Sequence, residues 1–159
     1  MIKNVELNDI ILYGSFYLGL KVGLSKHDIE RILGKPFGNV DIETPDLNFY
    51  YIELKNGLVL SILFDKQDIC FEINLNLEEN KDLNLIIQFE DHLETINPTI
   101  PFEKLIAIIS KLNVEWEFDI KKIYLQTICI RLKNGLRLYY AFGNKNDYGF
   151  FSIKSIIET

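Results

Sequence analysis

The stretch IELKNGLVL at residues 52–60 returns as IRLKNGLRL at residues 130–138, an offset of 78 residues. In both copies, apolar and polar residues alternate on each side of Lys-Asn-Gly. Such alternation predicts two antiparallel strands joined by a tight turn, because successive side chains of a strand point to opposite faces. We expect a three-residue loop in each copy, at residues 55–57 and 133–135, with its glycine in the left-handed backbone region.

The register of each hairpin follows from which side chains must share a face. A two-residue loop of Asn56 and Gly57 would place Leu60 opposite Glu53 and mix core with solvent. With the three-residue loop, Leu54 lies opposite Leu58 and the apolar residues gather on one face. That core face carries Tyr50, Ile52, Leu54, Leu58, Leu60, Ile62 and Phe64 in the first hairpin, and Ile128, Ile130, Leu132, Leu136, Leu138, Tyr140 and Phe142 in the second.

A helical pattern precedes each hairpin. In the first copy, Ser25 is a suitable N-cap with Asp28 three residues later, and Gly34-Lys35-Pro36 stops the helix. In the second copy, Pro101 suits the first turn. The apolar stripe that follows at helical spacing consists of Phe102, Leu105, Ile106, Ile109 and Leu112. Further strands are expected at residues 68–75, 83–89, 114–118 and 148–153.

We therefore expect an α+β fold of two pseudo-repeats, residues 1–78 and 79–159, which share one core and could form a single domain. Each pseudo-repeat would be one helix followed by an antiparallel β-meander, with the sheets packed on the helices. The other face of each sheet would stay partly open. We expect it to carry Tyr51, Glu53, Val59, Ser61 and Asp65 in the first half, and Cys129, Arg131, Arg137, Tyr139 and Ala141 in the second. This composition suits an interface and a solvated face equally.

The composition indicates a folded chain without a membrane span. Of the 159 residues, 48 % are hydrophobic and 13 % aromatic, too many for a disordered polypeptide. The longest uncharged stretch, residues 10–20, has eleven residues, whereas a membrane helix needs about 20. Glu6 and Asp9 precede that stretch, whereas a secretory signal has a basic start and a small-residue cleavage site, so we expect no secretory signal and a cytoplasmic protein.

Cys70 and Cys129 both lie in apolar runs and lack CxxC spacing. In a reducing compartment, such cysteines are expected to be buried packing residues. A disulfide or a reactive thiol is the alternative interpretation.

The residues that could carry chemistry do not form a recognisable catalytic or metal site. The two histidines are His27, in a helical first turn, and His92, in the acidic run Glu90-Asp91-His92-Leu93-Glu94. Carboxylates can orient an imidazole for a metal or for general-base work, but a solvated acidic loop is the simpler interpretation because no HxxxH, CxxC or HxH is present. GxSxG, Walker-type and GxGxxG motifs are also missing. We expect no catalytic residue, no metal, no cofactor and no enzyme activity.

The charge is acidic and uneven. Residues 1–78 hold 7 basic and 12 acidic side chains, a net charge of −5, and residues 79–159 hold 10 and 11, a net charge of −1. An acidic surface repels nucleic acid and attracts basic proteins. The acidic groups are Asp41, Glu43 and Asp46; Asp65, Asp68 and Glu72; Glu78, Glu79 and Asp82; Glu90, Asp91 and Glu94; and Glu115, Glu117 and Asp119. As partner-binding residues we expect Tyr51, Glu53, Asp65, Asp68, Glu72 and Tyr139.

The stretch LGLKVGLSKHDIERILGKP at residues 18–36, followed by a tyrosine-rich hairpin, resembles small bacterial immunity proteins of polymorphic or contact-dependent-inhibition toxin systems. The tandem layout is also similar to the beta-lactamase-inhibitor-protein-like fold. The resemblance covers residues 18–65, and the second half lacks the LGxP helix stop.

This resemblance implies an immunity protein that neutralises a cognate toxin domain, often a nuclease with a basic groove, by one-to-one binding. We expect a monomer or weak homodimer that binds neither nucleic acid nor membrane. The alternative is a non-catalytic scaffolding module that forms homodimers through its open sheet face.

Overall fold

The computed structural model describes residues 3–76, 80, 83–143 and 150–157. The first half of the chain forms β1 (Lys3–Glu6), α1 (Asn8–Tyr13), α2 (Lys26–Leu33), β2 (Ile42–Glu43), β3 (Leu47–Glu53), β4 (Val59–Asp65) and β5 (Cys70–Asn76). The second half forms β6 (Leu83–Gln88), β7 (Leu93–Ile96), α3 (Phe102–Lys111), β8 (Trp116–Phe118), the 3-10 helix η1 (Ile120–Lys122), β9 (Thr127–Leu132), β10 (Arg137–Ala141) and β11 (Phe150–Ile156).

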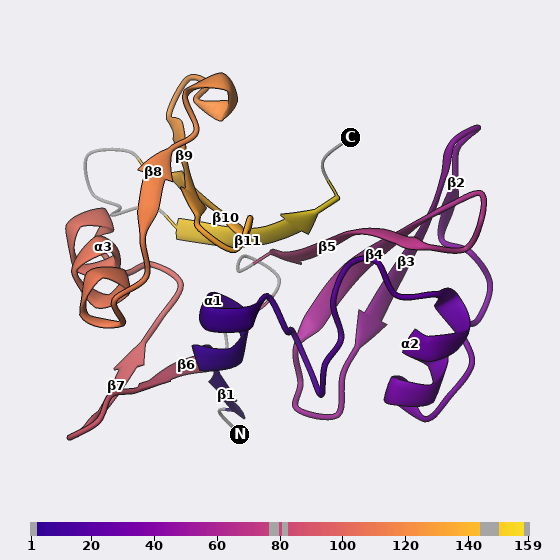
Figure 1. Cartoon of the computed structure of the whole chain (residues 1–159), viewed down its shortest axis with the longest axis horizontal. Helices are drawn as coiled ribbons and strands as arrows, with labels where there is room; N and C mark the ends of the chain where they lie inside the picture. Colours follow the sequence, from indigo (N-terminus) through magenta and orange to yellow (C-terminus); the bar gives the residue numbers. More distant parts are fainter. Residues whose placement is uncertain (1–2, 77–79, 81–82, 144–149, 158–159) are drawn as a thin grey trace.

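The fold is α+β, with three α-helices among the described residues and a large antiparallel sheet. The eight strands of this sheet follow the order β2-β3-β4-β5-β11-β10-β9-β8, from right to left in Figure 1. Each half of the chain contributes four consecutive strands, and β5 pairs with β11, where Leu75 lies opposite Ile153. The sheet is therefore continuous across the two halves instead of two separate sheets.

A second, smaller sheet was not expected from the sequence. It has the order β1-β6-β7, with β1 parallel to β6 and β7 antiparallel to it. The helix α1, which follows β1, was also not expected. The chain is thus richer in strand than one helix and one meander for each half.

Both hairpins have the three-residue loop and the register that the alternation predicted. The Leu54 N–H donates to the Leu58 carbonyl at 2.8 Å, and the Leu132 N–H donates to the Leu136 carbonyl at 2.8 Å. Gly57 and Gly135 have φ angles of +89° and +87°. Because side chains other than glycine rarely adopt such angles, the two glycines serve the backbone of the turn.

The core lies between the core face of the large sheet and a layer that contains the helices and the small sheet. The Phe37 ring, just after α2, contacts the Tyr50 ring at 4.8 Å, and the Phe102 ring in α3 contacts the Tyr140 ring at 5.4 Å. Between them, the turn of the second hairpin donates a hydrogen bond to the Ile11 carbonyl in α1 at 2.9 Å. Figure 1 shows α3, α1 and α2 one after another along the sheet. One hydrophobic cluster joins buried residues of both halves.

The start and stop signals of the first helix predicted from the sequence, which is α2, are confirmed. The Ser25 hydroxyl accepts the Asp28 N–H at 3.1 Å, and Gly34 ends α2 with a φ of +70°. The expected strands at residues 68–75, 83–89, 114–118 and 148–153 correspond to β5, β6, β8 and β11. Residues 148 and 149 lie outside the described part of the chain, as do Glu78, Glu79 and Asp82 of one acidic group.

Both cysteines are packing residues, as expected. Cys70 and Cys129 are fully buried, and neither forms a disulfide. Burial raises the pKa of the Cys70 thiol to about 12, which keeps it protonated and unreactive at neutral pH. None of the helices in the described residues is long and apolar enough to span a membrane.

Candidate functional site

The face of the large sheet that points away from the core and the helices, here called the open face, carries a band of polar side chains. The strand registers place its members directly opposite one another on seven neighbouring strands. From β3 to β8 the band consists of Tyr51, Ser61, Asn74, Lys154, Arg137, Arg131 and Glu117. Along each strand these residues alternate with core residues, so their side chains point to the open face and polar residues are tolerated there.

A hydrogen-bonded network occupies the centre of the open face, where β5 meets β11. The Lys154 ammonium lies 3.1 Å from a Glu72 carboxylate oxygen and 5.6 Å from the centre of the Tyr139 ring. The Asn74 amide donates to Glu72 at 2.8 Å and to the Ser61 hydroxyl at 3.2 Å. Glu72 is therefore already matched by a cation and holds together the junction between the two halves.

The β10–β9 part of this face is less open than expected. Cys129 is fully buried, and the Arg137 and Asp119 side chains are only 8 % and 12 % exposed. The reason is pairing across strands: the Arg137 Nε donates to an Asp119 carboxylate oxygen at 3.0 Å. This hydrogen bond lowers the pKa of the Asp119 carboxyl. Beside them, burial raises the pKa of the half-buried Tyr139 to about 12.

Tyr51 and Glu53, two of the expected partner-binding residues, lie side by side at the β3 end of the open face. The Tyr51 side chain is 49 % exposed, and Glu53 is also exposed. Both border a groove of about 290 Å³ with Asp41, whose carboxylate accepts the Tyr51 N–H at 2.8 Å. Glu43 and Asp46 are exposed on the adjacent β2–β3 hairpin. We call Asp41, Glu43, Asp46, Tyr51 and Glu53 the acidic end.

Asp65 and Asp68 shape the turn between β4 and β5. The Asp65 carboxylate accepts the N–H groups of Gln67 and Ile69, each at 2.9 Å. Asp68 has a φ of +57°, and its carbonyl accepts the Lys26 N–H of α2 at 2.8 Å. The geometry of the turn is therefore sufficient to explain why both positions are aspartate.

The six expected residues do not form one cluster. Tyr51 and Glu53 are neighbours, Glu72 lies at the centre of the open face, and Tyr139 lies on β10. Four strand spacings separate Tyr51 from Tyr139, about 19 Å at the usual spacing.

A group of exposed apolar side chains, the apolar loop cluster, was not expected from the sequence. It lies in and beside the β8–β9 connection and consists of Phe118, Ile120, Ile123, Tyr124, Leu125 and Phe142. Phe142 was expected on the core face; it packs against the Tyr140 ring there, but it is 41 % exposed. Ile120 and Leu125 are 79 % and 85 % exposed, and Leu125 has a φ of +49°. Apolar patches of this kind mark interaction sites, and unusual backbone angles gather at such sites. The available signal was the apolar and basic run Ile120-Lys121-Lys122-Ile123-Tyr124-Leu125 between two strands.

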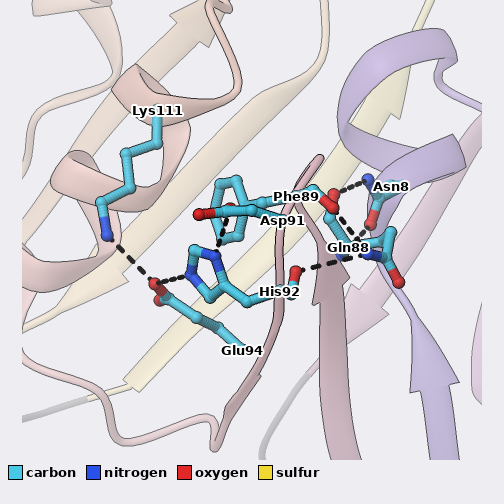
Figure 2. Close-up of polar contacts among 7 residues, drawn as sticks. All are labelled: Asn8, Gln88, Phe89, Asp91, His92, Glu94 and Lys111. Atoms are coloured by element: carbon cyan, nitrogen blue, oxygen red, sulfur yellow. Dashed lines mark hydrogen bonds and ion pairs between the residues drawn. The ribbon is translucent and has the colours of Figure 1, made fainter.

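His92 lies in the β6–β7 turn, where carboxylates contact both ring nitrogens (Figure 2). Nε2 lies 3.0 Å from Glu94, Nδ1 contacts Asp91, and the ring stacks on Phe89 at 5.0 Å. Hydrogen bonds to Glu94 and Asp91 raise the pKa of His92, because both partners favour the doubly protonated imidazolium. The Lys111 ammonium of α3 also contacts Glu94 at 3.0 Å, so this cluster links the turn to the helix. Among the described residues, no three His, Cys, Asp or Glu side chains are grouped as metal ligands would be.

No protein-family model, curated protein or solved structure matches the chain.

Proposed function

We propose that this protein is a cytoplasmic immunity protein that binds a cognate bacterial toxin domain one to one and neutralises it. The observation that carries the proposal is the large sheet packed against helices on its core face, with an exposed tyrosine and acidic side chains at one end of the opposite face. Covering a toxin's active surface requires no catalytic residue, metal or cofactor. The likeness of residues 18–65 to immunity proteins points the same way.

The charge of the acidic end favours a toxin with a basic surface, such as a nuclease with a groove for phosphate. Exposed carboxylates of Asp41 and Glu53 lie next to Tyr51. Those of Glu43 and Asp46 are farther along the β2–β3 hairpin, where Glu43 lies 3.5 Å from the Lys66 ammonium. Carboxylates of this kind speed encounter with a cationic surface, and a central tyrosine supplies apolar contact and a hydroxyl. We assign Tyr51 and Glu53 to the centre of the contact and Tyr139 to its far side. Asp65 and Asp68 would act at its rim, and Glu72 would lie between the two tyrosines. The same carboxylates disfavour nucleic acid and anionic membranes as direct partners.

We further propose that the two halves are pseudo-repeats, each a helix followed by a meander. In support, the two hairpins share their loop and register, and β3-β4-β5 and β9-β10-β11 follow in the same order. The last strands of the two halves, β5 and β11, pair at the centre of the sheet. We propose that the two pseudo-repeats correspond to the beta-lactamase-inhibitor-protein-like layout.

The test first asks whether the gene directly upstream encodes a toxin domain, and that domain is then expressed in a bacterial host with and without this protein. We expect co-expression to restore growth and the purified pair to form a one-to-one complex by light scattering. Tyr51→Ala should weaken binding by about 2 kcal/mol or more. Tyr13→Ala, at a tyrosine on α1 that is 70 % exposed, is the control and should leave binding unchanged. Association should slow as salt rises, with less effect on dissociation.

Two results would contradict the proposal at different levels. If the toxin remains active in the presence of excess protein, the immunity function is wrong. If the toxin is inhibited but Tyr51→Ala and Tyr13→Ala bind equally, inhibition stands and the assigned surface is wrong.

The second candidate is a scaffolding module that forms homodimers. The apolar loop cluster favours it, because a second copy could bury Ile120 and Leu125. Light scattering of the purified chain separates the two candidates. A dimer that Leu125→Asp converts to a monomer supports the scaffold, and a monomer at all concentrations excludes it.

A further inference from the structure

A groove of about 580 Å³ runs between β7 and α3, on a different part of the molecule from the acidic end. Glu94, Thr95 and Ile96 form its strand wall. Its helix wall consists of Lys104, Ala107, Ile108 and Lys111. The helix residues have the spacing of one helix face, and the strand residues are consecutive. Consecutive strand residues can all line a groove only where the backbone edge of the strand borders it.

The edge of β7 has backbone groups available for another strand. β7 is the last strand of the small sheet, in the order β1-β6-β7. The Phe89 N–H donates to the His92 carbonyl at 2.8 Å, so His92 is hydrogen-bonded to its partner strand. Because hydrogen-bonded and non-hydrogen-bonded pairs alternate in an antiparallel ladder, Glu94 and Ile96 also face β6. The N–H and C=O of Thr95 therefore point away from β6, toward the groove.

The dimensions of the groove suit a short extended segment. At one end, the Lys111 ammonium contacts Glu94 at 3.0 Å (Figure 2). Lys104 lies seven residues earlier on the helix, about 10 Å along its axis. Three strand residues span the same distance, about 10 Å. Ile96 and Ile108 are buried and form an apolar floor, and Ala107 is exposed and leaves room above it.

We propose that this groove binds an extended peptide, which adds to β7 as a fourth strand of the small sheet. The peptide residue opposite Thr95 exchanges two backbone hydrogen bonds with it, and an apolar side chain rests on Ala107 and Ile108. An acidic side chain of the peptide faces Lys104. The charges around the groove favour an acidic peptide. Glu94 forms ion pairs with Lys111 and His92, whereas Lys104 makes no ion pair with any residue that the structure describes. A groove of this volume lies within the usual range for ligand sites, about 300–1,000 Å³.

The probe is a phage-displayed library of random octapeptides, selected against the whole chain. Selection should enrich peptides in which an acidic residue accompanies alternating β-branched or other apolar residues. Thr95→Pro removes the outward N–H at an edge where proline is tolerated, and it should weaken the best peptide about fivefold. Thr95→Val keeps the N–H and should bind as the wild type does. Lys104→Glu should weaken binding about tenfold or more, and Lys121→Glu, an exposed lysine in η1, is its charge control.

A proline could unfold the strand, so the same hydrogen bonds are also tested from the peptide side. N-methylation of the peptide residue opposite Thr95 should abolish binding, and N-methylation of the next residue should not. The proposal is overturned if no acidic–apolar peptide is enriched. It is equally overturned if the Lys104→Glu protein binds the peptide as tightly as the wild type does and both N-methylated peptides bind as tightly as the unmethylated peptide. The toxin experiment does not involve this groove, so the immunity proposal and the peptide-binding proposal can each be refuted independently of the other.

Discussion

Two ion pairs cross the strands next to β8, and their different burial predicts very different effects on stability. Arg137 and Asp119 are 8 % and 12 % exposed, whereas Arg131 and Glu117 are 41 % and 63 % exposed. Arg137→Met would leave a buried carboxylate without its cation, which costs about 3–5 kcal/mol. Arg131→Met removes an exposed pair worth about 0.2–1 kcal/mol. With a urea dependence of about 2 kcal/mol/M, a loss of about 4 kcal/mol lowers the unfolding midpoint by about 2 M.

Urea unfolding followed by circular dichroism at neutral pH measures both variants. Adding Asp119→Leu to Arg137→Met should recover most of the loss, because no buried charge then remains. The pH dependence provides a second check. Arg137 lowers the pKa of Asp119, so the pair's contribution is present at neutral pH and disappears as the pH falls through that lowered value. Equal losses for Arg137→Met and Arg131→Met would refute the claim that burial decides the cost.

The other stability predictions concern the hairpin glycines and His92. Gly57→Ala and Gly135→Ala should each lower the free energy of unfolding by about 1 kcal/mol or more, because alanine is strained at their positive φ angles. Gly38→Ala, where an added Cβ meets open space, is the control in thermal melts, and equal melting temperatures for all three would contradict the turn geometry. His92→Gln should destabilise most below pH 6.5, because a raised histidine pKa stabilises the fold there and the effect is lost as pH rises through the folded-state pKa. Melting temperatures at pH 5.5 and pH 9 that differ from the wild type by the same amount would exclude this role.

The hairpins could be predicted from the sequence because their signals are local. The register follows from the alternation around Lys-Asn-Gly, and only one loop length places all the apolar residues on one face. The Ser25 cap and the Gly34 stop lie within one turn of the residues they affect. Such contacts depend on near neighbours, so a short window of sequence contains the information.

The small sheet could not be predicted in the same way. β1 has four residues, and its partner β6 lies about eighty positions later, where Val5 pairs with Leu85. A four-residue strand is too short to show a reliable period, and a parallel partner leaves no turn signal between the two strands. The strand β7, which forms one wall of the groove beside α3, was not predicted either, so the groove could not be inferred from the sequence.

The sequence predicted which face of the sheet the candidate residues occupy, but it did not predict which charged residues are buried by pairing. Strand parity correctly placed Tyr51 and Glu53 on the outward face of β3. Parity does not reveal whether an outward side chain meets solvent or a partner on another strand. Arg137 and Asp119 are 18 positions apart in sequence and become buried because they meet.

The same reasoning distinguishes among the acidic residues proposed for partner binding. A carboxylate attracts a basic surface strongly only if a cation of its own protein does not already neutralise it. Glu72 lies 3.1 Å from the Lys154 ammonium and is nearly buried, so a toxin would have to displace that lysine before gaining a new ion pair. Glu53 is exposed beside Tyr51, so a partner can reach its carboxylate from solvent without opening the network at the centre of the sheet. Electrostatic attraction should therefore arise chiefly at the acidic end, and Glu72 should contribute mainly by holding β5 and β11 together.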